Sequence, residues 1–252
     1  MSCLVQVIAH RGYSSRAPEN TLASFDLALA SGYPHIEFDV HLTSDAIPVV
    51  IHDATVARTT NGRGRVDSMN LERVKQLNAG EWFDRANRGG LYARERVPTL
   101  EEILKRYAGA AHLYIELKSE EPELPVIVAE LLSKNFWLTD NNSDNCAVPG
   151  VTIISFDLEQ LRRSKRILAG VPHGYLCKNL DSTSLDMCLY NNIEGLFPFI
   201  KSLNHESVKA AHLAGLVVGT WGASEPKDIL PAVNMGVLGV TVDWPDAAKD
   251  IL

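Results

Sequence analysis

Residues 35–53 read HIEFDVHLTSDAIPVVIHD, which is two strand-like segments separated by the turn-like stretch TSDAI. HIEFDV and PVVIHD are rich in apolar and β-branched residues, as buried strands are. A parallel crossover needs roughly a dozen residues or more, and the connection here is much shorter. PVVIHD is therefore predicted to fold back antiparallel on the preceding strand, as a hairpin.

Short apolar runs of the same kind recur along the whole chain, with a helical pattern between most of them. Together with HIEFDV they number eight: LVQVIAH, HIEFDV, HLYIELK, VTIISF, GYLC, GLFPFI, LVVGTWG and LGVTVD. Alternating β and α segments indicate a parallel sheet, and eight parallel strands close a (β/α)8 TIM barrel. The length of 252 residues suits one such barrel, although two smaller domains also fit it. We expect residues 1–252 to form a single α/β domain.

Two segments are predicted to lie outside the barrel frame. Residues from about 53 to 97 form a small insertion after the second strand, at the C-terminal face, with TTNGRGR and RANRGG near its edges. The polar DNNSDN segment near Asp144 is expected to be a surface loop. Two helix starts are also legible, because Thr99 and Glu102, and likewise Asp157 and Gln160, have the spacing of a capping box.

Composition excludes several classes of protein. The net charge of -7 and the lack of a Lys/Arg run argue against binding to nucleic acid or to an anionic membrane surface. No apolar run approaches the length of a transmembrane helix. The four cysteines show no zinc-ligand spacing, so we expect a reduced, cytoplasmic protein, with a removed signal peptide left open. The sequence makes no prediction of the oligomeric state.

Charged and polar residues stand at the ends of the predicted strands, where a barrel places its active site. The side chains in question are His10 and Arg11 after the first strand, Glu37 and Asp39 on the second, His52 at the end of the hairpin, and Glu116 and Lys118 on the third. Strand alternation sends Glu37 and Asp39 to one face, and Glu116 and Lys118 likewise. Charges on inward faces need partners or a ligand, because a buried unpaired charge costs several kcal/mol or more.

Three carboxylates that converge on one site repel one another unless a cation lies between them. Glu37, Asp39 and Glu116 are therefore predicted to bind one divalent cation, and their oxygen ligands suit Mg²⁺, Ca²⁺ or Mn²⁺ better than zinc. The alternative is a structural network in which the same carboxylates pair with Arg11 and Lys118. Those two basic residues also suit a phosphate, the Arg through its planar fork and the Lys as a point charge.

Two histidines are candidates for proton transfer. His10 and His52 stand beside the acidic cluster, and imidazole both donates and accepts protons at neutral pH. The remaining histidines have no comparable partners and are interpreted as structural or surface residues: His35, His41, His112, His173, His205 and His212.

The sequence resembles the glycerophosphodiester phosphodiesterase family over essentially its whole length. The resemblance is carried by HRGYSSRAPENTLASF, EFDVHLTSDAIPVVIHD, YIELK, TWGA and VTVDWP, which occur in the same order and at similar spacing. It implies a barrel in which Glu37, Asp39 and Glu116 hold the cation and His10 and His52 are the acid/base pair. It further implies that Arg11 and Lys118 hold the phosphate.

The resemblance also assigns three supporting residues. Glu19 and Asn20 would brace the His10–Arg11 loop, and Trp221 would pack against the glycerol or its alcohol substituent. Asn20 has a simpler alternative as the cap of a helix that begins near Leu22, and a Trp at a strand end also fills a barrel mouth. TWGASEP and VTVDWP depart from the usual family pattern, which leaves the leaving-group preference open.

The expected reaction is hydrolysis of sn-glycero-3-phosphodiesters, such as glycerophosphocholine and glycerophosphoethanolamine, to sn-glycerol 3-phosphate and an alcohol. His10 is predicted to be the acid and His52 the base, with the substrate's C2 hydroxyl or a water as nucleophile. The alternatives on the same barrel are a lysophospholipase D-like or phosphoinositide-type lipase and a non-catalytic phosphodiester-binding protein. A zinc amidohydrolase is disfavoured because the first strand has no His-x-His.

Overall fold

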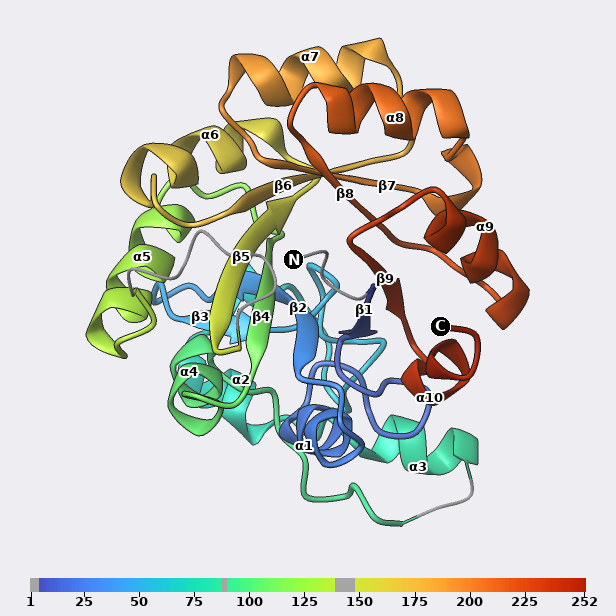
Figure 1. The fold of residues 1–252 in the computed structure, drawn as a ribbon. Helices are drawn as coiled ribbons and strands as arrows, with labels where there is room; N and C mark the ends of the chain where they lie inside the picture. The colour runs from blue at the N-terminus through green and yellow to red at the C-terminus, as the bar shows by residue number, and fades with distance from the viewer. Residues whose placement is uncertain (1–4, 88–89, 139–147) are drawn as a thin grey trace.

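The computed structural model describes residues 5–87, 90–138 and 148–252, and its centre is a closed barrel (Figure 1). Eight strands in these ranges run parallel in the order β1-β2-β4-β5-β6-β7-β8-β9, and β9 pairs back onto β1. Their bounds are β1 (Gln6–His10), β2 (His35–Leu42), β4 (His112–Leu117), β5 (Gly150–Ser155), β6 (His173–Cys177), β7 (Gly195–Pro198), β8 (Val217–Thr220) and β9 (Gly239–Val242). The predicted (β/α)8 barrel is confirmed.

The ninth strand, β3 (Pro48–Val50), pairs antiparallel with β2 as predicted, with Val40 opposite Val50. The β1–β2 pairing ends where His10 lies opposite Glu37, and β2 continues beyond it. Because β4 occupies the other edge of β2 as far as Val40, β3 takes the edge that β1 leaves free. The hairpin therefore brings the residues after β3 back over the mouth of the barrel.

Helices form the outer layer around the strands (Figure 1). They are α1 (Leu22–Ala30), α4 (Leu100–Arg106), α5 (Leu124–Lys134), α6 (Leu158–Ile167), α7 (Ser182–Tyr190), α8 (His205–Leu213), α9 (Ile229–Asn234) and α10 (Pro245–Lys249), with the short 3-10 turns η2 (Ile200–Ser202) and η3 (Pro226–Asp228). Thr99 and Glu102 form the predicted capping box of α4. Asp157 caps α6, but the Gln160 side chain donates instead to the carbonyls of Ser119 and Glu121, so the second box is not made.

The segment between β3 and α4 holds η1 (Val66–Ser68), α2 (Leu71–Gln76) and α3 (Glu81–Asn87). It has an apolar cluster of its own, separate from the main core: Val49, Ile51, Val56, Val66, Met69, Val74, Ala79 and Val97. The main core lies between the strands and the outer helices and includes Phe25, Phe38, Leu104 and Tyr107. The DNNSDN segment lies outside the described residues.

The barrel interior changes character from bottom to top. At the N-terminal ends of the strands, His112 bonds the Thr152 hydroxyl and Tyr114 donates to Gln6. Above them lies an apolar layer of Ile8, Tyr114, Ile154, Leu176 and Phe197, and the charged residues stand at the C-terminal mouth. This arrangement concentrates reactive groups at one end of the barrel. Among the described helices, none has the length and apolar character needed to cross a bilayer.

Candidate active site

A pocket of about 270 Å³ opens at the C-terminal ends of the barrel strands. One side of it is polar and is lined by residues from β1, β2, β4 and the loops after β3 and β9: His10, Arg11, Glu37, His52, Glu116, Lys118 and Asp243. The other side is largely apolar and is lined by residues that include Ile154, Phe156, Leu176, Phe197, Trp221, Ala223 and Val242. All the residues predicted for catalysis and phosphate binding therefore line this pocket, and the buried Asp39 lies next to two of its lining residues, Glu37 and Glu116.

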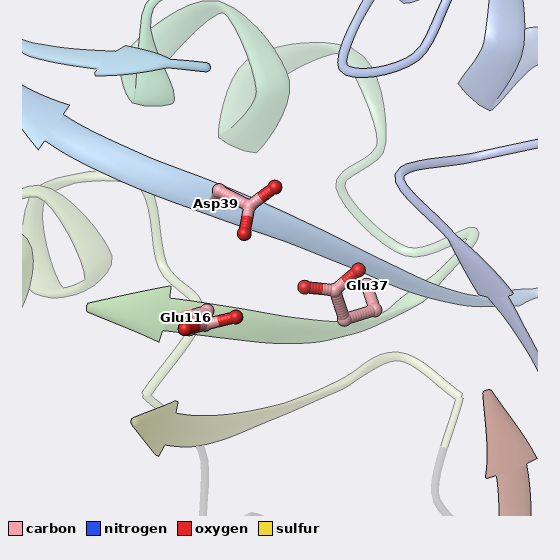
Figure 2. Close-up of side chains that lie close together, drawn as sticks. All are labelled: Glu37, Asp39 and Glu116. Carbon is pink, nitrogen blue, oxygen red and sulfur yellow. The ribbon is translucent and has the colours of Figure 1, made fainter. Parts of the chain in front are cut away.

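The three predicted metal ligands come together on neighbouring strands (Figure 2). Glu37 and Asp39 project from β2, and Glu116 lies opposite Asp39 on β4. One carboxylate oxygen of each lies within 4.8 Å of the others, and all three side chains are buried. The register between β2 and β4, set by backbone pairing, is what brings these acids together.

The buried charges shift the pKa values of the carboxylates in opposite directions. Burial and the charge of Asp39 raise the pKa of Glu37 to about 7, and they raise the pKa of Glu116 well above its ordinary value. Burial also opposes ionisation of Asp39, but Arg11 and Lys118 outweigh it and hold the pKa of Asp39 well below its usual range. Arg11 and Lys118 thus stabilise the ionised form of Asp39, but they do not do the same for Glu37 and Glu116.

Arg11 and Lys118 both contact the acidic cluster. Arg11 Nε lies 3.2 Å from Asp39 Oδ2, and its backbone N–H donates to Glu37. Lys118 Nζ lies 2.8 Å from Glu116 Oε1 and 3.4 Å from Asp39 Oδ1. The charge network considered above as an alternative is therefore present in this structure. This charge network is incomplete, because Asp39 Oδ1 is buried and accepts no hydrogen bond from a described residue. The carboxylate oxygens of the cluster are ligand atoms of the kind that fit a hard cation.

His10 is held by a carboxylate that sequence reasoning missed. Its Nδ1 lies 2.6 Å from Asp243 Oδ1, which also accepts a hydrogen bond from the Ser14 hydroxyl. Its Nε2 lies 3.9 Å from Glu37 Oε2. Burial alone lowers the pKa of His10, but the hydrogen bond to Asp243 and the charge of Glu37 outweigh it, so the pKa is raised. Asp243 directly follows β9, and this position at the end of a strand is the feature of the sequence that marks it as a candidate site residue.

His52 has an equivalent partner in its sequence neighbour. Its Nδ1 lies 2.6 Å from Asp53 Oδ1, and its carbonyl accepts a hydrogen bond from His41 Nε2. Burial lowers the pKa of His52, despite the nearby charge of Asp39 and the hydrogen bond that the ring donates to Asp53. The other oxygen of Asp53 accepts from Arg58 Nε at 2.8 Å, and this hydrogen bond is the main cause that lowers the pKa of Asp53 to about 2. Neither Asp53 nor Arg58 was among the predicted site residues.

Glu19 and Asn20 both contact the site. Glu19 Oε1 accepts a hydrogen bond of 2.8 Å from Arg11 Nη1. Asn20 Nδ2 donates to Asp39 Oδ2 at 2.8 Å, and the backbone N–H of Asn20 donates to the carbonyl of Arg11. Asn20 does not cap the first helix, since Thr21 is the N-cap residue of α1. Glu19 and Asn20 therefore orient a predicted cation ligand as well as the arginine.

Trp221 lies on the apolar side of the pocket. Its Nε1 donates to the carbonyl of Phe197, and its ring packs edge-on against Phe156, with ring centroids 5.3 Å apart. The ring of Phe199 also packs against the Trp221 ring, in a tilted arrangement with ring centroids 5.2 Å apart. Lys118 Nζ is also 5.7 Å from the centre of the Phe156 ring. The result is an aromatic wall that faces the charged groups across the pocket.

The fold and the pocket define a class: α/β barrels whose C-terminal mouth combines a buried acidic cluster with basic residues and histidines. A sequence model described as the glycerophosphoryl diester phosphodiesterase family matches residues 10–247, and the chain belongs to this family.

Relatives match the chain over almost its full length. It is 35% identical to a glycerophosphodiester phosphodiesterase of Caldanaerobacter subterraneus, over 98% of this chain and 97% of the relative. It is 32% identical to a glycerophosphodiester phosphodiesterase of Bacillus subtilis, over 96% of this chain and 84% of the relative. Among solved structures, an Oleispira antarctica phosphodiesterase in complex with the product sn-glycerol-3-phosphate is 31% identical, with a TM-score of 0.88 and coverage of 98% and 96%.

Proposed function

We propose that this protein hydrolyses sn-glycero-3-phosphodiesters, such as glycerophosphocholine and glycerophosphoethanolamine, to sn-glycerol 3-phosphate and an alcohol. The observation that carries the proposal is the meeting, in one pocket, of a buried acidic cluster, two basic residues and two carboxylate-paired histidines. Full-length similarity to glycerophosphodiester phosphodiesterases supports the choice of substrate, as does a neighbouring structure that contains sn-glycerol 3-phosphate.

The proposed ligands of one divalent cation are Glu37, Asp39 and Glu116. Their oxygen donors favour Mg²⁺ or Ca²⁺, with Mn²⁺ as a further candidate. When bound, such a cation supplies charge stabilisation to the phosphoryl oxygens during the displacement. Asn20 supports this role because its side-chain amide donates to Asp39 Oδ2 and so orients the carboxylate.

The proposed mechanism assigns the remaining polar residues by their contacts. Arg11 and Lys118 bind the phosphate and balance its charge in the transition state. Each histidine ring has Nδ1 bonded to a carboxylate, which leaves Nε2 for the substrate. His10 protonates the departing alkoxide, and His52 takes the proton of the attacking hydroxyl. If water attacks, sn-glycerol 3-phosphate forms directly; if the C2 hydroxyl attacks, the alcohol leaves from a cyclic phosphate, and a water then opens the ring to give sn-glycerol 3-phosphate. The raised pKa of His10 and the lowered pKa of His52 agree with this division.

An assay for released sn-glycerol 3-phosphate tests this proposal. Purified protein is incubated with glycerophosphocholine and glycerophosphoethanolamine in the presence of Mg²⁺, Ca²⁺ or Mn²⁺, and again after exhaustive treatment with EDTA. We expect turnover that stops on chelation and returns with one of the cations. Undiminished activity after chelation would refute the cation, and no product with any cation would refute the reaction.

A second candidate substrate follows from the apolar side of the pocket. Phe156 is 42% exposed at the rim, and Trp221 and Phe197 continue the wall inward. A lysophospholipid could place part of its acyl chain along this wall, and its cleavage would be a lysophospholipase D activity. Choline release from lysophosphatidylcholine and from glycerophosphocholine decides between the two, because kcat/KM for the preferred class should exceed that for the other.

We also propose a cytoplasmic location. The thiols of Cys177 and Cys188 are buried and free, and burial raises the pKa of both to about 12. Free thiols suit a reducing compartment. Fractionation of the source cells, followed by detection of the protein with an antibody, tests the location directly.

A further inference from the structure

Arg58 links the two halves of the polar site. Arg58 Nε and Nη2 donate to the two oxygens of Asp53 at 2.8 and 3.1 Å. Its Nη1 and Nη2 donate to the two oxygens of Glu19 at 2.7 and 2.9 Å. Asp53 in turn bonds His52, and Glu19 bonds Arg11. One guanidinium thus holds both the carboxylate that orients a histidine and the carboxylate that supports the phosphate-binding arginine.

We propose that Arg58 is a positioning residue that fixes the His52 ring in its reactive orientation by clamping Asp53 against Glu19. This inference rests on the proposed function only in that His52 serves as a catalytic residue. A planar guanidinium has donors in a rigid fork, so it determines the plane of each carboxylate that it grips on both oxygens. With Asp53 held in that plane, its Oδ1 faces Nδ1 of His52, and Nε2 is left facing the pocket.

The loop that carries Arg58 does not depend on this side chain for its place in the fold. Val56, two residues earlier, is fully buried in the apolar cluster of the 53–97 segment. Its backbone N–H donates to the carbonyl of Gly64, and the Thr60 hydroxyl donates to the carbonyl of Val56. The side chain of Arg58 is itself 43% exposed, and exposed ion pairs contribute little to stability. Loss of this side chain should therefore leave the fold intact.

The two sides that Arg58 holds, Asp53 with His52 and Glu19 with Arg11, should respond differently when the Arg58 side chain is removed. Arg11 keeps two carboxylate partners, Glu19 and Asp39, so the phosphate-binding group stays in place. Asp53 keeps a side-chain contact only with His52 among the described residues, and its carboxylate becomes free to rotate. We therefore expect an effect on kcat and little effect on KM, because His52 acts in the transition state.

Steady-state kinetics of Arg58→Ala test the inference. We expect kcat to fall roughly tenfold to a hundredfold, the range seen when partners that orient a reactive group are removed. Added guanidinium chloride should restore part of kcat, and methylammonium chloride should not, since only guanidinium reproduces the fork. The matched control is Arg65→Ala, which removes an exposed arginine of the same segment that also grips an aspartate, Asp67, and kcat should stay at the wild-type value.

A double variant separates positioning from other causes. In the His52→Ala background, Arg58→Ala should cause no further loss of kcat, because residues that act through one another are not additive. The proposal is overturned if the two losses multiply, or if Arg58→Ala alone keeps the kcat of the wild type.

A readout that needs no activity keeps this inference distinct from the proposed function. The ring ¹⁵N signals of His52, assigned by their loss in His52→Ala, should indicate a single tautomer protonated on Nδ1 in the wild type. They should change in Arg58→Ala and stay unchanged in Arg65→Ala. If the wild type hydrolyses none of the substrates and the signals still behave this way, the reaction is wrong and the positioning role stands. Unchanged signals in Arg58→Ala overturn the positioning role whatever the activity.

Discussion

At the scale of single residues, the three carboxylates of the acidic cluster are not equivalent. Asp39 is paired with Arg11 and Lys118 and accepts a hydrogen bond from Asn20, so it stays ionised. Glu37 and Glu116 have raised pKa values because they are buried beside that permanent charge. Asp39 is therefore the carboxylate that stays ionised, and Glu37 and Glu116 are the two whose ionisation a bound cation would favour.

The first prediction concerns Glu37→Gln, which removes one charge and keeps the shape of the side chain. We expect the affinity for Mg²⁺ or Ca²⁺ and the activity to fall sharply, while the free energy of unfolding of the metal-free protein stays the same or rises, because the repulsion with Asp39 is relieved. Calorimetric titration with the cation and urea denaturation measure the two quantities. Glu72→Gln, at an exposed surface carboxylate, is the control. A marked loss of stability with unchanged cation affinity would favour a purely structural charge network.

The second prediction assigns the two histidines. His10→Ala and His52→Ala should each lower kcat by roughly 10² to 10⁴-fold on a natural substrate, with small changes in KM. A p-nitrophenyl phosphodiester has a leaving group that needs little protonation, so His10→Ala should recover much of its rate on it and His52→Ala should not. Recovery of His52→Ala instead would exchange the roles. Near-native rates of both variants on the natural substrate would remove both residues from catalysis.

At the scale of elements, the β2–β3 hairpin determines where His52 lies. β3 pairs with the part of β2 that extends past the end of β1, and the chain returns to the barrel mouth within a few residues of the turn. In the turn, Ala46 has a φ of 58°, which lies in the left-handed region. Its N–H donates to the carbonyl of Thr43, so the turn is closed by the backbone despite the unfavourable conformation.

The third prediction follows from that turn. A left-handed conformation costs a non-glycine residue roughly 1–2 kcal/mol, partly offset by the greater freedom of glycine in the unfolded chain. Ala46→Gly should therefore raise the free energy of unfolding by about 0.5–1 kcal/mol. Urea denaturation measures it, with Ala210→Gly on the exposed face of α8 as a control that should lose up to about 1 kcal/mol. A loss of stability in Ala46→Gly would contradict the account of the turn.

At the scale of the whole molecule, acid stability depends on histidines buried in the barrel and its helices. His173 donates from Nδ1 to the carbonyl of Val171, and its Nε2 accepts from the Ser164 hydroxyl, so the folded protein holds the ring neutral. Burial lowers the pKa of His173 to about 3 from its ordinary value of 6.5. The ring of His173 therefore takes up a proton at a higher pH in the unfolded chain than in the folded protein.

The fourth prediction is the resulting pH dependence. Above pH 6.5 the ring is neutral in both states and contributes nothing. As the pH falls below 6.5, the unfolded chain binds a proton that the folded protein excludes, so His173 lowers the free energy of unfolding by up to about 1.4 kcal/mol per pH unit. His173→Gln should make the slope between pH 6.5 and 4.5 shallower, and His205→Gln, at an exposed position, should not. Equal slopes in all three proteins would contradict the assignment.

Much of this architecture can be predicted from the sequence because it follows from local patterns. Strand alternation places Glu37, Asp39 and Glu116 on inward faces, and the short TSDAI connection allows only a hairpin. The capping box at Thr99 is formed within one helical turn, so its spacing predicts it. These features depend on residues that are close in the sequence or in one periodic pattern.

The contacts that escaped prediction depend on residues brought together by the fold. Gln160 leaves its expected capping role because carbonyls of the loop after β4 compete for its side chain. Asp243 reaches His10 only because closure of the barrel sets β9 beside β1, as Figure 1 shows. Arg58 is 39 residues from Glu19 in the sequence, and no local pattern marks the pair.

The pocket described above has polar residues on one side and apolar residues on the other. The two groups also come from different parts of the sequence. The acidic cluster, the basic residues and both histidines come from β1 to β4, and the aromatic wall comes from β5 to β8. Exchange of the second half of the barrel between relatives would therefore change substrate selection and leave the reactive groups in place, provided that an aspartate follows β9. A chimaera that keeps the first half of this barrel and takes its second half from a relative would thus test leaving-group preference separately from the reaction itself.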